Sequence, residues 1–281
     1  MTPRVCVTPG LYVVLVALIV AVGLLALPTE ARALVTCPAA NPAADSDGDG
    51  FTDGQECTGL TLPQGMALLD GTTTIPSCTP GAVRSRCLDP NGKDLFVIVA
   101  PAAAGSLLPP VDLFGNVTLN GVTFTGLADL GITVHQITST VGRAVTPTQN
   151  AVRIAESLDI SDTVLGICNW GTPNELDGCV VYTQRIKNFI DSTCNSAGDT
   201  TTNRTDVLNA YVVHTVLHET GHTLGGLTSS YNKRYGGNHY AAGSGLIMEQ
   251  SETYSTKGGV CTWNITSRWN PTLDPPAVDL K

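Results

Sequence analysis

Three residues in the C-terminal third of the chain have types and spacing suited to metal chemistry: His218, Glu219 and His222. The two histidines are four residues apart, so on a helix their imidazoles project from one face, about 6 Å apart along the axis. Two imidazoles in that arrangement suit one tetrahedral zinc ion. Glu219 lies about 100° further round the helix, where its carboxylate reaches a metal-bound water without ligating the metal. This H-E-x-x-H pattern predicts a zinc site with Glu219 as general base.

A catalytic zinc site needs a third protein ligand and keeps one position open. Five histidines are present, so three remain as candidates. His214 precedes the pair by one turn and is expected to support the site or the core, and His135 lies in a predicted strand. His239, beyond the glycines that end the helix, is the best candidate. The alternative is a downstream carboxylate, for which Glu249 and Glu252 are available.

The segment 206–224 is predicted to be the helix that holds this pattern. Thr205 or Asn203 can cap its start, Asp206 suits the positive end of the helix dipole, and Gly225-Gly226 ends it. Apolar residues lie on most of its sides, which is typical of a helix buried within its domain.

Upstream of the helix, apolar patterns predict a series of strands. Strands are expected at 95–100, 131–138, 151–155, 164–168 and 179–183, with a short helix over 184–192. By contrast, the segment 34–93 is rich in Cys, Gly, Pro, Asp and Thr and lacks apolar periodicity. We expect that segment to be dominated by loops and held together by disulfides.

Residues 218–225, His-Glu-Thr-Gly-His-Thr-Leu-Gly, resemble the first eight positions of the metzincin signature H-E-x-x-H-x-x-G-x-x-H. Gly245-Leu246-Ile247-Met248 resembles the Met-turn of that family, in which Met248 would form an apolar floor beneath the zinc. The signature places its third histidine at position 228, which is Thr228 here. If His239 takes that role, eleven residues are inserted before it, and its spacing of nine residues to Met248 is similar to that of matrixin-like members.

The resemblance implies an α+β fold, a metzincin-like catalytic domain with a twisted mixed β-sheet and a buried zinc-binding helix. It implies a secreted zinc endopeptidase that hydrolyses peptide bonds with a metal-activated water, Glu219 as general base, and His218, His222 and His239 as zinc ligands. It further implies that an edge strand, expected near Cys179–Thr183, pairs with an extended peptide substrate.

A second metal motif is the twelve-residue acidic segment 45–56. Carboxylates stand at its positions 1, 3, 5, 9 and 12 and a glycine at position 6, as in a calcium loop. The expected calcium ligands are the side chains of Asp45, Asp47, Asp49, Asp53 and Glu56 and the carbonyl of Phe51. Because Asn41-Pro42 leaves no incoming helix, the segment resembles a thrombospondin type 3 or dockerin-like loop more than a paired EF-hand. Its calcium is expected to be structural and to bind with a Kd on the order of 10⁻⁴–10⁻³ M.

The first 33 residues are predicted to be a signal peptide. Arg4 is the one charged side chain before an apolar run from Leu11 to Leu27, and Ala31-Arg32-Ala33 supplies small residues for cleavage after Ala33. The alternative is an uncleaved membrane anchor, because seventeen apolar residues reach the short end of a spanning helix. Cleavage would leave a secreted protein, extracellular or periplasmic, without a stable membrane anchor.

Cysteine usage agrees with export. Nine cysteines are present, of which Cys6 lies in the predicted signal, and an even set of eight follows it. In an exported chain that set predicts up to four disulfides. Sequence alone allows many pairings, among which Cys37–Cys57, Cys78–Cys87 and Cys168–Cys179 form short local loops.

Composition narrows the function classes. The chain is 42% hydrophobic and 14% charged, as expected of a globular protein with an apolar core. Its net charge of −9 and lack of basic clusters argue against nucleic acid as a partner. The metzincin resemblance implies a protein or peptide substrate. The expected organisation is a signal peptide (1–33), a Cys-rich segment with the calcium loop (34–93) and the peptidase domain (94–281). Two other functions stay open: a non-catalytic calcium-binding adhesion or surface protein, and a metal-dependent hydrolase of non-peptide substrates.

Overall fold

The structure is a computed structural model. It describes residues 34–119, 122–161, 164–170, 176–194, 200–224, 247, 254–257, 260–263 and 269. The predicted signal peptide lies outside these residues. Among the described helices, none is long and apolar enough to cross a membrane.

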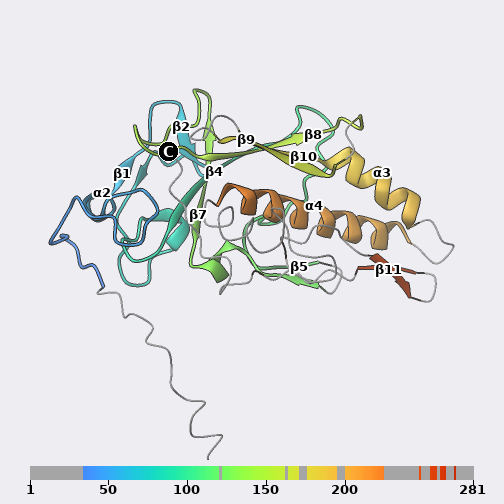
Figure 1. Ribbon diagram of the computed structural model, residues 1–281, viewed down its shortest axis with the longest axis horizontal. Coiled ribbons are helices and arrows are strands. Elements are labelled where there is room, and N and C mark those ends of the chain that lie inside the picture. Colours follow the sequence, from blue (N-terminus) through green and yellow to red (C-terminus); the bar gives the residue numbers. More distant parts are fainter. Residues whose placement is uncertain are drawn as a thin grey trace, which may run out of the picture. The chain divides into compact units, whose positions relative to one another are not determined.

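A six-stranded mixed sheet forms the centre of the protein, with the strand order β2-β7-β4-β8-β10-β9 (Figure 1). Its strands are β2 (Met66–Leu68), β4 (Asp94–Ala100), β7 (Thr133–Ser139), β8 (Val152–Ser157), β9 (Gly166–Trp170) and β10 (Leu176–Tyr182). The four inner strands run parallel, whereas β2 and β9 pair antiparallel at the two edges. The expected α+β class with a mixed sheet is therefore confirmed.

Each strand expected from the apolar patterns is present, but the predicted edge strand was wrong. β10, which contains most of the segment 179–183, pairs with β8 on one side and β9 on the other. Among the described strands, the edge strand on this side of the sheet is β9. Only five residues separate β9 from β10, too few for a parallel crossover, so the two strands form an antiparallel pair and β9 takes the outer position.

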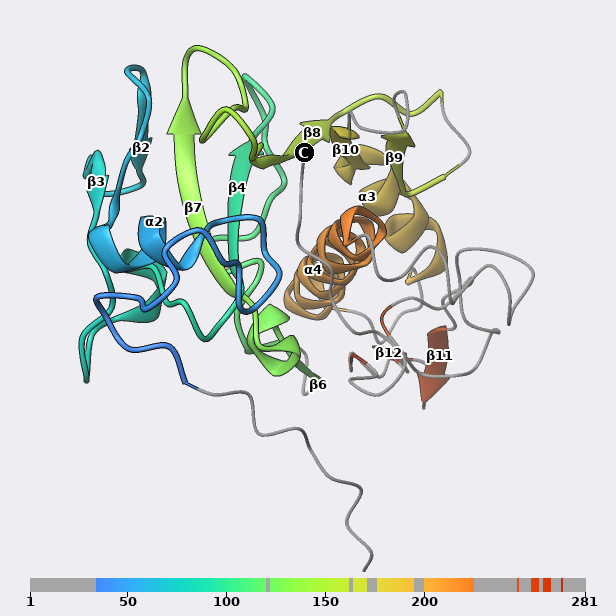
Figure 2. The ribbon, with the colours of Figure 1, turned by 60° about the vertical axis from the view of Figure 1, so that its left-hand side comes forward.

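Two helices pack together beside the last strands of the sheet (Figures 1 and 2). α3 (Thr183–Thr193) matches the predicted short helix, and α4 (Thr201–Thr223) contains the predicted zinc-site helix. α4 starts at Thr201 rather than at Asp206, so the predicted capping positions Asn203 and Thr205 lie within the helix. Its contacts with β8, β9, β10 and α3 bury all of residues 210–217.

Apolar side chains fill both faces of the sheet. Along β4, Leu95 and Val97 belong to the core shared with α4, while Phe96 and Ile98 belong to a second core on the opposite face. That second core also contains residues of the Cys-rich segment, such as Phe51. Burial on both faces explains why β4 reads as a continuous apolar run.

The segment 34–93 consists of short elements tied to the sheet. It contains α2 (Asp53–Thr58), a two-stranded pair of β1 (Leu60–Thr61) and β3 (Thr74–Ile75), the edge strand β2, and the 3-10 turn η1 (Arg84–Arg86). Further short elements are β5 (Val117–Leu119), β6 (Val122–Phe124), the 3-10 turn η2 (Leu127–Leu130), β11 (Tyr254–Lys257) and β12 (Val260–Trp263).

The three expected local disulfides are confirmed. Cys37–Cys57 and Cys78–Cys87 lie in the N-terminal segment, and Cys168–Cys179 joins β9 to β10. Cys194, at the end of α3, is disulfide-bonded as well. This number of disulfides fits an oxidising compartment outside the cytosol.

Candidate metal sites

The first candidate site lies on the C-terminal half of α4. His218 and His222 project from the same side of the helix, and their ring centroids are 4.9 Å apart. His222 is buried, with 9% of its surface exposed, and His218 is half-buried. The structure therefore brings together the two histidines that the i, i+4 spacing predicted.

A backbone contact orients the first of these imidazoles. Nδ1 of His218 lies 2.8 Å from the carbonyl oxygen of Ile247. Because a carbonyl only accepts, Nδ1 carries the proton in this contact and the acceptor lone pair is left on Nε2. Zinc-binding histidines are commonly oriented by such a bond to a backbone carbonyl. Ile247 directly precedes the Met248 of the predicted Met-turn.

The predicted third ligand and its alternatives fall largely outside the described residues. His239, Met248, Glu249 and Glu252 all lie there. Of the other two histidines, His214 has its ring centroid 5.9 Å from that of His218 and is 1% exposed. His135 belongs to a different part of the molecule, where it contacts Asp94 and Ser85.

Glu219 is held between α4 and the edge strand β9. It is 5% exposed, and a Cβ atom built on Gly166 would lie 2.5 Å from Oε1 and 2.7 Å from Cγ of Glu219. Two residues further along β9, Sγ of Cys168 lies 3.2 Å from Oε2. One side-chain atom each of Cys168, Cys179 and Glu219 lies within 4.8 Å of the other two, close enough to bind one metal ion. The two sulfurs, however, are joined in a disulfide and supply no thiolate. That cluster therefore positions the Glu219 side chain rather than binding a metal.

The second candidate site is the acidic loop before α2. Carboxylate oxygens of Asp45, Asp47 and Asp49 lie within 4.8 Å of one another. Asp45 closes the loop by accepting hydrogen bonds from the backbone N–H groups of Gly48 at 2.7 Å and Gly50 at 2.9 Å. Gly50, at position 6 of the motif, has a φ of 90°, which an L-residue rarely adopts. The expected turn chemistry of a calcium loop is thus present.

The last positions of the loop differ in what they contact. Asp53 begins α2, and its carboxylate accepts hydrogen bonds from N and Oγ of Ser46 at 2.9 and 2.8 Å. Position 9 of a calcium loop often acts through a water, and a carboxylate bound to Ser46 fits that indirect role. Phe51, the predicted carbonyl ligand, buries its ring against Phe96 with centroids 5.4 Å apart.

Glu56, at position 12, is the most unusual member of the loop. It is 0% exposed, and among the described residues no donor reaches either of its carboxylate oxygens; Oδ2 of Asp47 likewise has no donor. Burial, with repulsion between the carboxylates, raises the pKa of Glu56 to about 10, that of Asp49 to about 8 and that of Asp47 to about 7. A divalent cation would remove this penalty, and all-oxygen ligands suit calcium.

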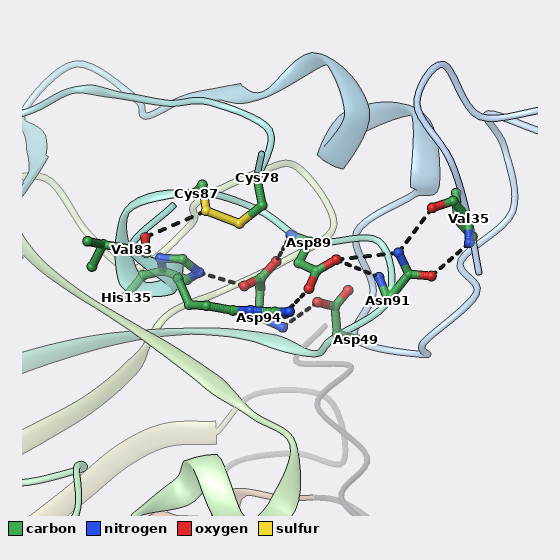
Figure 3. Close-up of polar contacts among 10 residues, drawn as sticks. Val35, Asp49, Cys78, Val83, Cys87, Asp89, Asn91, Asp94 and His135 are labelled. Atoms are coloured by element: carbon green, nitrogen blue, oxygen red, sulfur yellow. Dashed lines mark hydrogen bonds and ion pairs between the residues drawn. A yellow bond between two sulfur atoms is a disulfide. The ribbon is translucent and has the colours of Figure 1, made fainter. Parts of the chain in front are cut away.

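One acidic residue at this site was not predicted. Asp94, the first residue of β4, is 1% exposed, and a carboxylate oxygen of it lies within 4.8 Å of oxygens of Asp49 and Glu56. Figure 3 shows Asp94 beside Asp49 and His135. Burial raises the pKa of Asp94, although its contact with His135 acts in the opposite direction. The available signal was an acidic residue placed directly before a buried apolar strand.

Comparison with known proteins gives no assignment. No family model matches the chain, and searches of the curated proteins and of the solved structures found no match either. Any proposal of function therefore depends on the two sites described above.

Proposed function

We propose that this protein is a secreted zinc-dependent endopeptidase of the metzincin type. The observation that carries the proposal is the arrangement on α4, where the paired imidazoles of His218 and His222 stand next to a buried Glu219 that contacts the edge strand. His218 already has the orienting Nδ1 contact that zinc-binding histidines use.

Zinc, when bound, would lower the pKa of a bound water and polarise the substrate carbonyl. His218 and His222 would hold the ion, and His239 remains the predicted third ligand with Met248 beneath it. Glu219 would take a proton from the attacking water and pass it to the leaving amine. The contacts of Glu219 with Gly166 and with Sγ of Cys168 would fix the direction of its carboxylate.

The edge strand β9 supports a peptide as the substrate class. The outer side of an edge strand offers backbone N–H and C=O groups to which an extended peptide can pair. β9 is also the strand that contacts Glu219, through Gly166. A peptide added to β9 would therefore run past the proposed general base.

The test combines zinc analysis with cleavage of a quenched fluorescent peptide library. Glu219→Gln should retain about one zinc ion per chain and lose turnover by roughly 10²–10⁴-fold, the usual contribution of a general base. His222→Ala and His239→Ala should lose or sharply weaken zinc binding. Loss in His222→Ala alone would move the third ligand to another residue, with Glu249 and Glu252 as the candidates.

Two outcomes would contradict the proposal. Wild-type turnover in Glu219→Gln would remove the mechanism. No zinc in the metal-replete wild type would favour the second candidate function, a non-catalytic calcium-binding adhesion or surface protein. That alternative draws on the acidic site, whose proposed calcium does not depend on zinc at α4.

A further inference from the structure

The twelve-residue calcium motif ends at Glu56, yet its carboxylates meet a residue 38 positions further along the chain. Asp94 stands at the start of β4, between the parallel neighbours β7 and β8. Its backbone N–H donates to Oδ2 of Asp49 at 2.6 Å (Figure 3). Its carboxylate approaches those of Asp49 and Glu56. The loop and the central sheet therefore share one cluster of three buried carboxylates.

The spacing of this cluster matches the coordination sphere of one calcium ion. Calcium binds oxygen at about 2.3–2.6 Å, so two ligands of the same ion lie at most about 5 Å apart. The carboxylate oxygens of Asp49, Glu56 and Asp94 satisfy that limit, since they lie within 4.8 Å of one another. Each of the three residues is buried.

The unpartnered side chain of Glu56 is a second and independent indication of a cation. Its two oxygens are buried with no donor among the described residues. The neighbouring lysine does not fill this role, because Nζ of Lys93 donates to the carbonyl oxygens of Asp47 and Gly48, at 2.6 and 3.3 Å. Arg84 is directed to the carboxylate of Asp89. A buried carboxylate without a hydrogen-bond donor is costly, and a directly bound cation removes that cost.

Asp94 is held in place for such a role. Its Oδ1 contacts Nε2 of His135 at 2.7 Å, and its Oδ2 accepts from the backbone N–H of Asp89 at 3.0 Å. The other nitrogen of His135 contacts the carbonyl of Ser85 at 3.0 Å, which fixes the imidazole. An ionised carboxylate offers about four lone-pair sites, so these two contacts leave Asp94 able to bind a metal.

We propose that Asp94 is a ligand of the same calcium ion as Asp49 and Glu56, so that this ion ties the N-terminal acidic loop to the first residue of β4. The bound ion is then a link between two parts of the fold as well as a support for its own loop. This proposal does not depend on zinc or on peptidase activity.

The experiment is a calorimetric calcium titration of the purified chain after treatment with EGTA and return of one equivalent of zinc. The variants are Asp94→Asn and Glu56→Gln, with Asp159→Asn as the control. Asp159 is an exposed carboxylate that accepts hydrogen bonds from the backbone N–H and the hydroxyl of Ser161, so its substitution makes the same change in charge outside the cluster. Wild type and control should bind with equal affinity, whereas Asp94→Asn and Glu56→Gln should each weaken binding by tenfold or more. The proposal would be overturned if the Asp94→Asn variant bound calcium as tightly as the control does. It would also be overturned if the wild type bound no calcium at 10⁻² M, a concentration about ten times the weakest expected Kd.

Hydrogen exchange on the wild type gives a second test that does not require a variant to fold. Calcium should slow exchange of the backbone amides of Asp89 and Asp94, which bond to the carboxylates of the cluster, along with those of the loop itself. Protection confined to residues 45–58 would overturn the proposal, because the ion would then organise the loop alone.

Discussion

Replacing Gly166 by alanine tests whether β9 positions Glu219. A Cβ atom at this position would lie 2.5 Å from Oε1, 2.7 Å from Cγ and 2.8 Å from Cδ of Glu219. None of these distances is possible between unbonded atoms, so either the Glu219 side chain or the edge strand has to move. Retreat of Glu219 is limited because its side chain is buried, with 5% of its surface exposed, and Sγ of Cys168 lies 3.2 Å from Oε2.

The size of the effect follows from that confinement. Relieving the contact needs a shift of about 1 Å, and an added methyl group in a packed site costs about 1–3 kcal/mol of stability. A displacement of about 1 Å in a catalytic group can lower turnover by about 10²-fold. Zinc content should be unchanged, because His218 and His222 are not touched.

The assay has two independent readouts, urea unfolding and peptide turnover. In a double-mutant cycle, the unfolding cost of Gly166→Ala should largely disappear when Glu219 is replaced by alanine, since the opposing atoms are then gone. Ala67→Val on the other edge strand, β2, serves as a control that adds volume far from Glu219 in the strand order. If Gly166→Ala costs the same unfolding free energy with and without the Glu219 side chain, the contact is refuted. If Gly166→Ala leaves turnover undiminished, the role of this contact in catalysis is refuted.

Two further predictions concern buried carboxylates. In EGTA the protein should lose stability as the pH rises from 5 to 8, because Glu56 (pKa about 10) and Asp49 (pKa about 8) hold protons in the folded state that the unfolded chain releases near pH 4. The free energy of unfolding should fall by about 1.4 kcal/mol per pH unit for each proton retained. At pH 8, 10 mM calcium should restore about 2–3 kcal/mol if the Kd is on the order of 10⁻⁴ M. Melting temperatures in EGTA that do not fall with rising pH would contradict this prediction. Glu156→Gln should cost about 2–3 kcal/mol in urea unfolding. Each oxygen of Glu156 accepts from one backbone N–H, of residue 102 or 107, and from one hydroxyl, of Ser106 or Thr183, whereas an amide keeps a single acceptor oxygen and its NH2 group would face a backbone N–H. Burial acts to raise the pKa of Glu156, but these hydrogen bonds outweigh it and lower the pKa below its usual value, so the stability they supply should be lost as the pH falls through that lowered pKa.

The amino-acid sequence by itself predicted the features that depend on short stretches of chain. The i, i+4 spacing of His218 and His222 predicted that they share a helix face, because helical geometry repeats every few residues. The acidic segment 45–56 carries its glycine and carboxylates at fixed offsets, so a loop suited to calcium could be read directly. The alternating and continuous apolar runs predicted the strands for the same reason.

Only the tertiary structure decided which distant segments meet. Strand patterns do not encode strand order, so β10 was taken for the edge and β9 was found there. The approach of Gly166 to Glu219 depends on how α4 lies against that edge, and the approach of Asp94 to Glu56 depends on where β4 begins relative to the loop. Such contacts arise from sheet order and packing between segments tens of residues apart, whereas periodicity within a segment records only which of its own faces are buried.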